Sequence, residues 1–146
     1  MVTAFEAMAQ SGKAGEKPQE EAPLRVLIVE DDPDQSSILR EVLTSHGFSV
    51  AAAADGIEAE KIISGRPFDV VVSDIRMPNM DGLELARRLA VRERPPAIIL
   101  ITAFPSPRTV ELGYTAGAAR VLSKPFSLEK FIQWVGEVGR GRRPGP

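Results

Sequence analysis

The stretch from Asp69 to Gly82 constrains the fold more than any other part of the sequence. It begins with Val70 to Val72, a continuous run of β-branched residues. Such a run is typical of a strand that is buried on both faces of a parallel sheet. The strand ends in a carboxylate, Asp74, whose charge is costly to bury unless a cation lies near it. The neighbours of Asp74 therefore decide what the chain can do.

Four further segments match short buried strands, and helical patterns separate them. These strands are predicted at 24–29, 48–53, 97–102 and 121–123. Strands that alternate with helices in this way favour an α/β fold, with a parallel sheet covered on both faces. A length of 146 residues fits one such domain.

The first two helices have recognisable starts and apolar faces. Pro33 suits the first helical position after a capping residue, Asp32. The apolar face of this helix is predicted to contain Ile38, Leu39, Val42 and Leu43. In the second helix, which Asp55 caps, the residues expected to face inward are Ile57, Ile62 and Ile63.

The two ends of the chain differ in composition from the middle. Glycine, glutamine, proline and charges of both signs dominate from Gln10, so we expect a flexible N-terminal extension over 1–23. The folded domain is predicted over 24–140, followed by a basic tail over 141–146. The net charge of −2 provides no general attraction to nucleic acid or to an anionic membrane, and we expect direct contact with neither.

Polar side chains follow four of the five predicted strands. They are Glu30, Asp31, Asp74, Thr102 and Lys124. The carboxyl ends of parallel strands share one edge of a sheet, and the second strand ends only in Ala53-Ala54. If the second strand lies outermost, the other four bring their polar ends together. This gives the order 2-1-3-4-5 of the flavodoxin-like (βα)5 three-layer sandwich, whose ligands bind between strands one and three.

These polar residues favour phosphoryl transfer. Clustered carboxylates without His or Cys are hard oxygen ligands that suit Mg²⁺. Lys124 adds a point charge for a phosphoryl oxygen, and Thr102 adds a hydroxyl donor. Asp74 is then placed to act as the nucleophile and become an aspartyl phosphate. Each residue alone has an ordinary structural explanation, such as helix capping by the acids, but their combination at matched strand ends favours a function.

With these residues in view, the chain from about Leu24 to Arg140 resembles the receiver domain of response regulators in two-component signalling. Glu30 and Asp31 match the acidic pair of that family, and Asp74 matches its phosphoacceptor. The remaining matches are Arg76, Met77-Pro78, Asp81-Gly82, Thr102-Ala103 and Lys124-Pro125-Phe126.

The resemblance implies that a sensor histidine kinase, a histidine phosphotransfer protein or a small phosphodonor phosphorylates Asp74. It implies Mg²⁺ bound by Asp31, by Asp74 and by the backbone carbonyl of Arg76, with Glu30 acting through a water molecule. Lys124 and Thr102 would then hold phosphoryl oxygens. The inward turn of Thr102 would alter the surface of the fourth helix, fifth strand and fifth helix, which an unknown protein target binds. Such a chain is a cytoplasmic switch and not a turnover enzyme.

Three features depart from the common pattern of the family. Val121 occupies the position of the switch aromatic that usually moves with the threonine. Pro105 and Pro107 follow Thr102 and should stiffen the loop that is expected to move. Phe104 should hinder the attacking water, so we expect slow loss of the phosphoryl group.

The sequence leaves several alternatives open. A phosphorylation-independent pseudo-receiver would lose the acids or the lysine, which this chain keeps. A phosphatase of the haloacid dehalogenase type would need a different acidic motif at the first strand. A nucleotide binder would need a phosphate loop, and no GxxxxGK[ST] motif is present. Homodimer formation, and whether the chain stands alone or is cut from a longer protein, also stay open.

Overall fold

The computed structural model describes residues 22–142, in which strands and helices alternate. The strands are β1 (Arg25–Val29), β2 (Ser49–Ala53), β3 (Val70–Asp74), β4 (Ala97–Thr102) and β5 (Arg120–Ser123). The helices are α1 (Pro33–Ser45), α2 (Gly56–Gly65), α3 (Gly82–Ala90), α4 (Pro107–Thr115) and α5 (Leu128–Arg142). The predicted extension over 1–23 lies outside the described residues except for Ala22 and Pro23, and so do residues 143–146 of the predicted tail.

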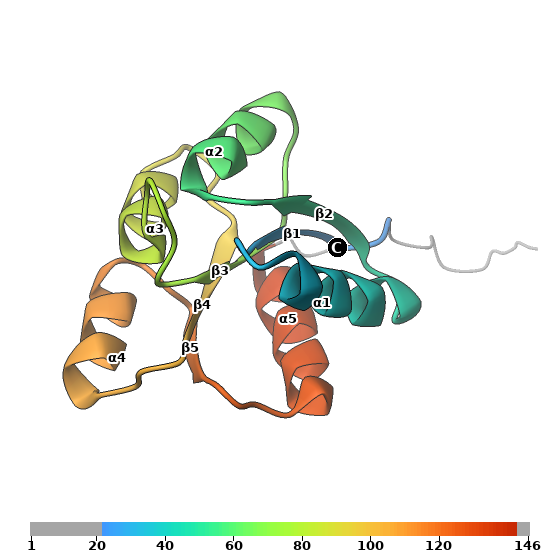
Figure 1. The fold of residues 1–146 in the computed structure, drawn as a ribbon. Coiled ribbons are helices and arrows are strands. Elements are labelled where there is room, and N and C mark those ends of the chain that lie inside the picture. The colour runs from blue at the N-terminus through green and yellow to red at the C-terminus, as the bar shows by residue number, and fades with distance from the viewer. Residues whose placement is uncertain (1–21, 143–146) are drawn as a thin grey trace, which may run out of the picture.

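The five strands form one parallel sheet in the order β2-β1-β3-β4-β5, which confirms the predicted fold and strand order (Figure 1). Asp74 pairs with Ile101, and Thr102 pairs with Ser123 in the neighbouring strand. This register places the polar residues that follow β1, β3, β4 and β5 at one edge of the sheet.

Successive side chains of each strand point to opposite faces of the sheet. Helices cover both faces, so the side chains form two separate apolar layers. Leu27 and Val71 point to the layer that α2, α3 and α4 cover, whereas Ile28 and Val72 point to the layer beneath α1 and α5. Figure 1 shows these two groups of helices on opposite faces. Phe131 of α5, which packs in the second layer, is the largest of the fully buried side chains.

The helix starts follow the predicted caps. The Asp32 carboxylate accepts a hydrogen bond from the backbone N–H of Asp34 at 2.9 Å, and the Asp55 carboxylate accepts one from Glu58 at 2.9 Å. The prediction that Ile38 and Ile57 face the core was wrong, however. Ile38 is 54% exposed and Ile57 is 45% exposed, because each lies at the rim of its helix face and not at its centre.

Within residues 22–142, no helix has both the length and the apolar character that a bilayer crossing requires.

Candidate functional site

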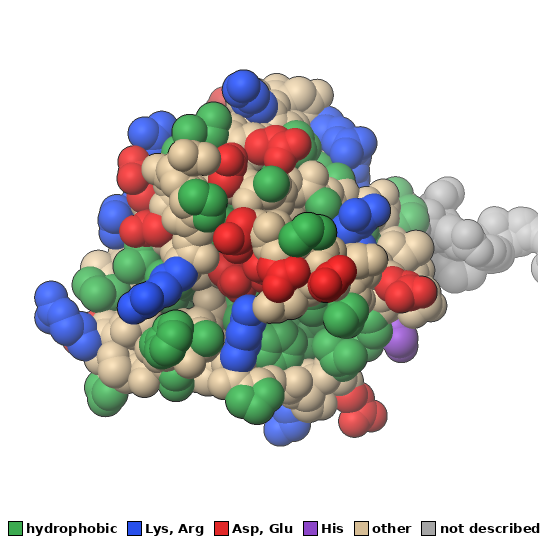
Figure 2. All heavy atoms as spheres, viewed as in Figure 1, with side chains coloured by type: hydrophobic (Ala, Val, Ile, Leu, Met, Phe, Trp, Pro, Cys, Tyr) green, Lys and Arg blue, Asp and Glu red, His purple; other side chains and the backbone are tan. Residues whose placement is uncertain are grey.

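Three carboxylates meet where β1 and β3 end. Glu30, Asp31 and Asp74 each offer an oxygen within 4.8 Å of the others. Glu30 is buried, Asp74 is half-buried and Asp31 is exposed, so the cluster opens from the sheet edge to solvent. Figure 2 shows acidic side chains gathered near the centre of this face. The predicted acidic cluster is therefore present, although the metal-binding role of each acid stays a prediction.

Lys124, which follows β5, is the cation of this cluster among the described residues. Its ammonium lies 3.4 Å from Asp74 Oδ2 and 3.9 Å from Glu30 Oε1. One ammonium only partly balances three carboxylates. Burial raises the pKa of Glu30 to about 7, and the nearby charge of Asp74 adds to this, whereas a hydrogen bond from the Asp32 backbone N–H opposes it.

The second oxygen of the Asp74 carboxylate supports a metal site. Asp74 Oδ1 is buried, and the described residues offer it no hydrogen-bond partner. A buried carboxylate oxygen without a donor is costly unless a ligand or a water molecule satisfies it. A hard divalent cation fits an unpaired carboxylate oxygen with two further acids beside it. The residues present therefore fit Mg²⁺.

A small pocket of about 50 Å³ lies beside Asp74. Its lining residues are Asp74, Arg76, Ile101, Thr102, Ala103, Phe104 and Lys124. The structure thus brings together the predicted acceptor, lysine and threonine. Thr102 is buried, and its hydroxyl oxygen accepts a hydrogen bond from the backbone N–H of Phe104 at 3.0 Å. The Lys124 backbone N–H donates to the Thr102 carbonyl at 2.8 Å.

Arg76 and Phe104 line the same pocket. The Arg76 guanidinium lies 4.7 Å from the centre of the Phe104 ring, in a cation–π contact. Phe104 is 63% exposed, so its ring borders the solvent side of the pocket. The predicted role of the Arg76 backbone carbonyl as a metal ligand stays a prediction.

The loop after Asp74 is held by contacts that the sequence did not indicate. Asn79 adopts a positive φ of 71°, and its side-chain amide donates to the Asp55 carboxylate at 2.9 Å. A side chain at Gly82 would collide with the Asp74 backbone carbonyl, so only glycine lets the chain pass there. These contacts fix the loop against the start of α2 and the end of β3.

Sequence reasoning also missed Gln35 of α1, whose side-chain carbonyl accepts a hydrogen bond from the Lys124 ammonium at 2.7 Å. At the predicted switch position, Val121 is half-buried, and its backbone N–H donates to the hydroxyl oxygen of Tyr114 in α4 at 3.4 Å. Neither contact has a signal in the local sequence, because each joins different elements of the fold.

Known proteins resemble this chain over most of its described part. Response regulator MprA of Mycobacterium sp. (strain KMS) is 40% identical over 110 residues, which are 75% of this chain and 48% of that protein. Response regulator MprA of Mycobacterium avium (strain 104) is 38% identical over 122 residues, which are 83% of this chain and 53% of that protein. The chain thus spans about half the length of these relatives.

Solved structures agree with this. The Francisella response regulator 1452 receiver domain has a TM-score of 0.78 and 28% identity, and the match covers 82% of this chain and 99% of that one. Vibrio cholerae chemotaxis protein CheY4 has a TM-score of 0.74 and 32% identity, with 80% and 99% of the two chains covered. The family model of the response regulator receiver domain matches residues 26–136. The chain therefore belongs to the response regulator receiver domain family.

Proposed function

We propose that this chain is a phosphoacceptor switch, and that Asp74 accepts a phosphoryl group from a sensor histidine kinase or a histidine phosphotransfer protein in the cytoplasm. A small phosphodonor could serve as well. The observation that carries this proposal is the pocket in which Asp74, Thr102 and Lys124 meet. A carboxylate, a hydroxyl and an ammonium at one small pocket provide a nucleophile and two groups that can hold phosphoryl oxygens.

In the proposed step, one carboxylate oxygen of Asp74 forms a bond to phosphorus. The bond between phosphorus and the histidine nitrogen of the donor breaks, and the imidazole leaves and takes up a proton. Lys124 holds one phosphoryl oxygen, which is consistent with its ammonium lying 3.4 Å from Asp74 Oδ2. The residues that would hold Mg²⁺ are Asp31, Asp74 and the Arg76 carbonyl, with Glu30 acting through water. When bound, Mg²⁺ would neutralise charge on the transferring oxygens.

The same geometry offers a route from Asp74 to the surface. The Thr102 hydroxyl accepts the Phe104 backbone N–H, so a turn of Thr102 toward a phosphoryl oxygen would release that N–H. The loop between β4 and α4 would then change its hydrogen bonding. We propose that this change shifts the equilibrium between conformations of the surface formed by α4, β5 and α5. A downstream protein target would bind this surface. A homodimer contact on this surface is a further arrangement that the proposal allows.

Val121 is proposed as the switch position, with a valine in place of the usual aromatic residue. Its backbone N–H contact with the Tyr114 hydroxyl supports a link between β5 and α4 at this point. We also propose that the receiver domain occupies 24–140, between an extension over 1–23 and a basic tail over 141–146. The family match over 26–136 supports the main part of this division.

Intact-mass measurement after incubation with acetyl phosphate and Mg²⁺ tests the proposal. We expect the wild-type chain to gain one phosphoryl group, and Asp74→Ala to gain none. Omission of Mg²⁺ should also abolish the gain. If a folded wild-type chain gains no phosphoryl group, the phosphorylation-independent interaction module becomes the better description.

A further inference from the structure

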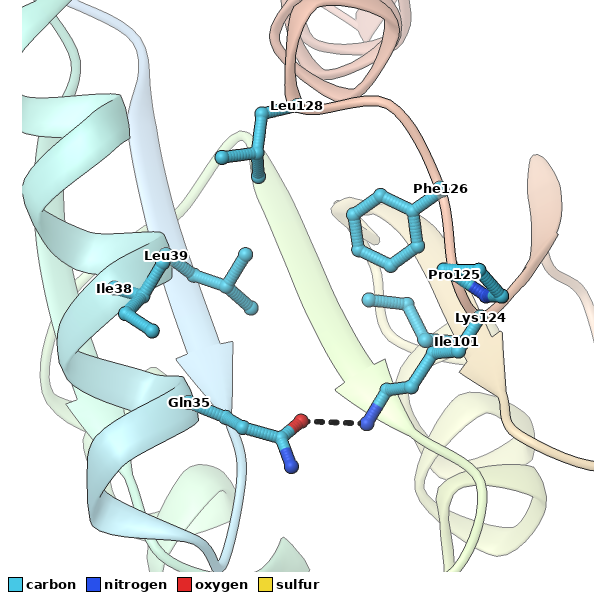
Figure 3. A pocket seen from close by; sticks show the side chains of 8 residues that line it. All are labelled: Gln35, Ile38, Leu39, Ile101, Lys124, Pro125, Phe126 and Leu128. Carbon is cyan, nitrogen blue, oxygen red and sulfur yellow. Dashed lines mark hydrogen bonds between the residues drawn. The ribbon is translucent and has the colours of Figure 1, made fainter.

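Lys124 separates two cavities. Its ammonium lies at the small pocket beside Asp74, which we call the acceptor pocket. Its side chain also lines a larger groove of about 510 Å³ between α1 and the segment after β5 (Figure 3). The other residues that line this groove are Gln35, Ile38, Leu39, Ile101, Pro125, Phe126 and Leu128. Among them, Gln35 alone has a polar side chain. Among the side chains that line the groove, Gln35 thus provides the hydrogen-bond acceptor for Lys124.

The contact between the two polar residues is short. The Lys124 ammonium donates to Gln35 Oε1 at 2.7 Å, and Figure 3 shows the two side chains pointing toward each other. The distances from the same ammonium to Asp74 and Glu30 are 3.4 Å and 3.9 Å. A hydrogen bond of 2.7 Å has near-ideal length, whereas the two carboxylate contacts are looser. Gln35 therefore fixes the position of the ammonium more closely than the acids do.

Gln35 is itself held in place by the start of α1. Its side-chain amide nitrogen donates to Asp32 Oδ2 at 3.2 Å, and its backbone N–H donates to Asp32 Oδ1 at 3.4 Å. An ammonium can only donate and a carboxylate can only accept, so the two ends of the carboxamide match their partners. The helix cap of α1 thus orients Gln35, and Gln35 orients Lys124.

We propose that Gln35 is a positioning residue for phosphoryl transfer, which holds the Lys124 ammonium at the edge of the acceptor pocket before the phosphoryl group arrives. This inference rests on the proposed phosphoacceptor function of Asp74. A free lysine side chain has many rotamers, and restricting them costs conformational entropy. The hydrogen bond to Gln35 already restricts the Lys124 rotamers in the unphosphorylated protein, so less entropy is lost when the phosphoryl group arrives. It also keeps the ammonium from closing onto Asp74 and Glu30, which leaves Asp74 accessible.

A double-mutant cycle on the rate of phosphorylation tests the proposal. The proteins are wild type, Gln35→Ala, Lys124→Ala and the double variant, with acetyl phosphate as the phosphodonor at saturating Mg²⁺. Gln35→Ala should slow the wild-type rate about fivefold, within the limit that lysine rotamer entropy sets. In the Lys124→Ala background the same substitution should change the rate by less than about 1.5-fold, because Gln35 acts only through Lys124.

A matched control is Gln133→Ala on α5. Gln133 is also an exposed helical glutamine, and its side-chain amide donates to Glu137, but it lies outside both cavities. This variant should leave the rate unchanged. Equal slowing by Gln35→Ala in both Lys124 backgrounds would overturn the proposal and indicate a general structural effect.

The ammonium resonance of Lys124 in a ¹⁵N-labelled sample provides a second measurement, which does not depend on phosphorylation. Gln35→Ala should shift this resonance and speed its exchange with water, whereas Gln133→Ala should do neither. An unchanged resonance in Gln35→Ala would also reject the proposal. If the wild-type chain is not phosphorylated at all while the resonance shifts as expected, the phosphoacceptor function fails and the contact between Gln35 and Lys124 stands.

Discussion

The Arg76 guanidinium lies over the Phe104 ring, 4.7 Å from the ring centre, and both residues line the pocket that contains Asp74. This pairs a residue from the segment after β3 with one from the segment after β4. At exposed sites such a contact contributes about 0.5 to 1 kcal/mol. In the proposed switch, an apolar ring at the solvent side of the pocket would offer an attacking water molecule no hydrogen-bond partner on that side.

We therefore expect Phe104→Glu to speed loss of the phosphoryl group at least severalfold. A glutamate can accept a hydrogen bond from the attacking water and can also pair with Arg76. The measurement is the decay of the phosphorylated mass after the phosphodonor has been removed. Val91→Glu is the control, because Val91 is 84% exposed and lies outside the pocket. Equal decay rates in Phe104→Glu and wild type would show that the ring does not limit hydrolysis.

Asp31→Asn should weaken Mg²⁺ binding at least about tenfold, since it removes one of three clustered carboxylates. Asp31 is exposed, so the fold should survive the change. Calorimetric titration of the unphosphorylated protein with MgCl₂ measures this effect. Asp34→Asn serves as the control, because this neighbouring exposed acid is not part of the cluster. The same loss of affinity in both variants would indicate a nonspecific charge effect.

Gly113→Ala should destabilise the protein, although alanine usually stabilises a helix by about 1 kcal/mol relative to glycine. A Cβ atom at Gly113 would lie 2.6 Å from Cγ2 of Val121. The side-chain or backbone shifts that such overpacking forces cost about 1 to 3 kcal/mol. Urea unfolding measures the change in free energy. In a Val121→Ala background the loss should shrink, because the colliding methyl group is absent. Gly65→Ala, with open space around its Cβ position, should cause no such loss.

Ile38→Ser should change the free energy of unfolding by less than about 0.5 kcal/mol, because this side chain is 54% exposed. Leu43→Ala on the same helix should cost about 2 to 5 kcal/mol, because Leu43 is fully buried. Thermal or urea unfolding of the two variants compares them directly. A large loss from Ile38→Ser would mean that Ile38 packs in the core.

The sequence predicted the features that depend on local pattern. The strand order followed from four polar strand ends and one apolar end, since parallel strands share an edge. Asp32 and Asp55 were recognisable as caps, because a cap acts within its own first helical turn. The position of Asp74 at the end of a buried strand followed from the same kind of local evidence.

The contacts between distant elements could not be predicted in this way. Gln35 and Lys124 are 89 residues apart, and no periodicity links a residue on α1 to the end of β5. The hydrogen bond from the Asn79 side chain to Asp55 likewise joins residues that are 24 positions apart. Helical periodicity also cannot separate a core residue from one at the rim of a groove, which is why Ile38 was misplaced.

The sheet keeps two apolar layers apart, with α1 and α5 over one and α2, α3 and α4 over the other. Contacts around Asp74 lead into both: Lys124 reaches Gln35 of α1, whereas Thr102 contacts the loop before α4. Surface changes on α1 need not repack the layer beneath α4. The helices over one layer can therefore diverge in evolution separately from the helices over the other, while both groups continue to share the site around Asp74.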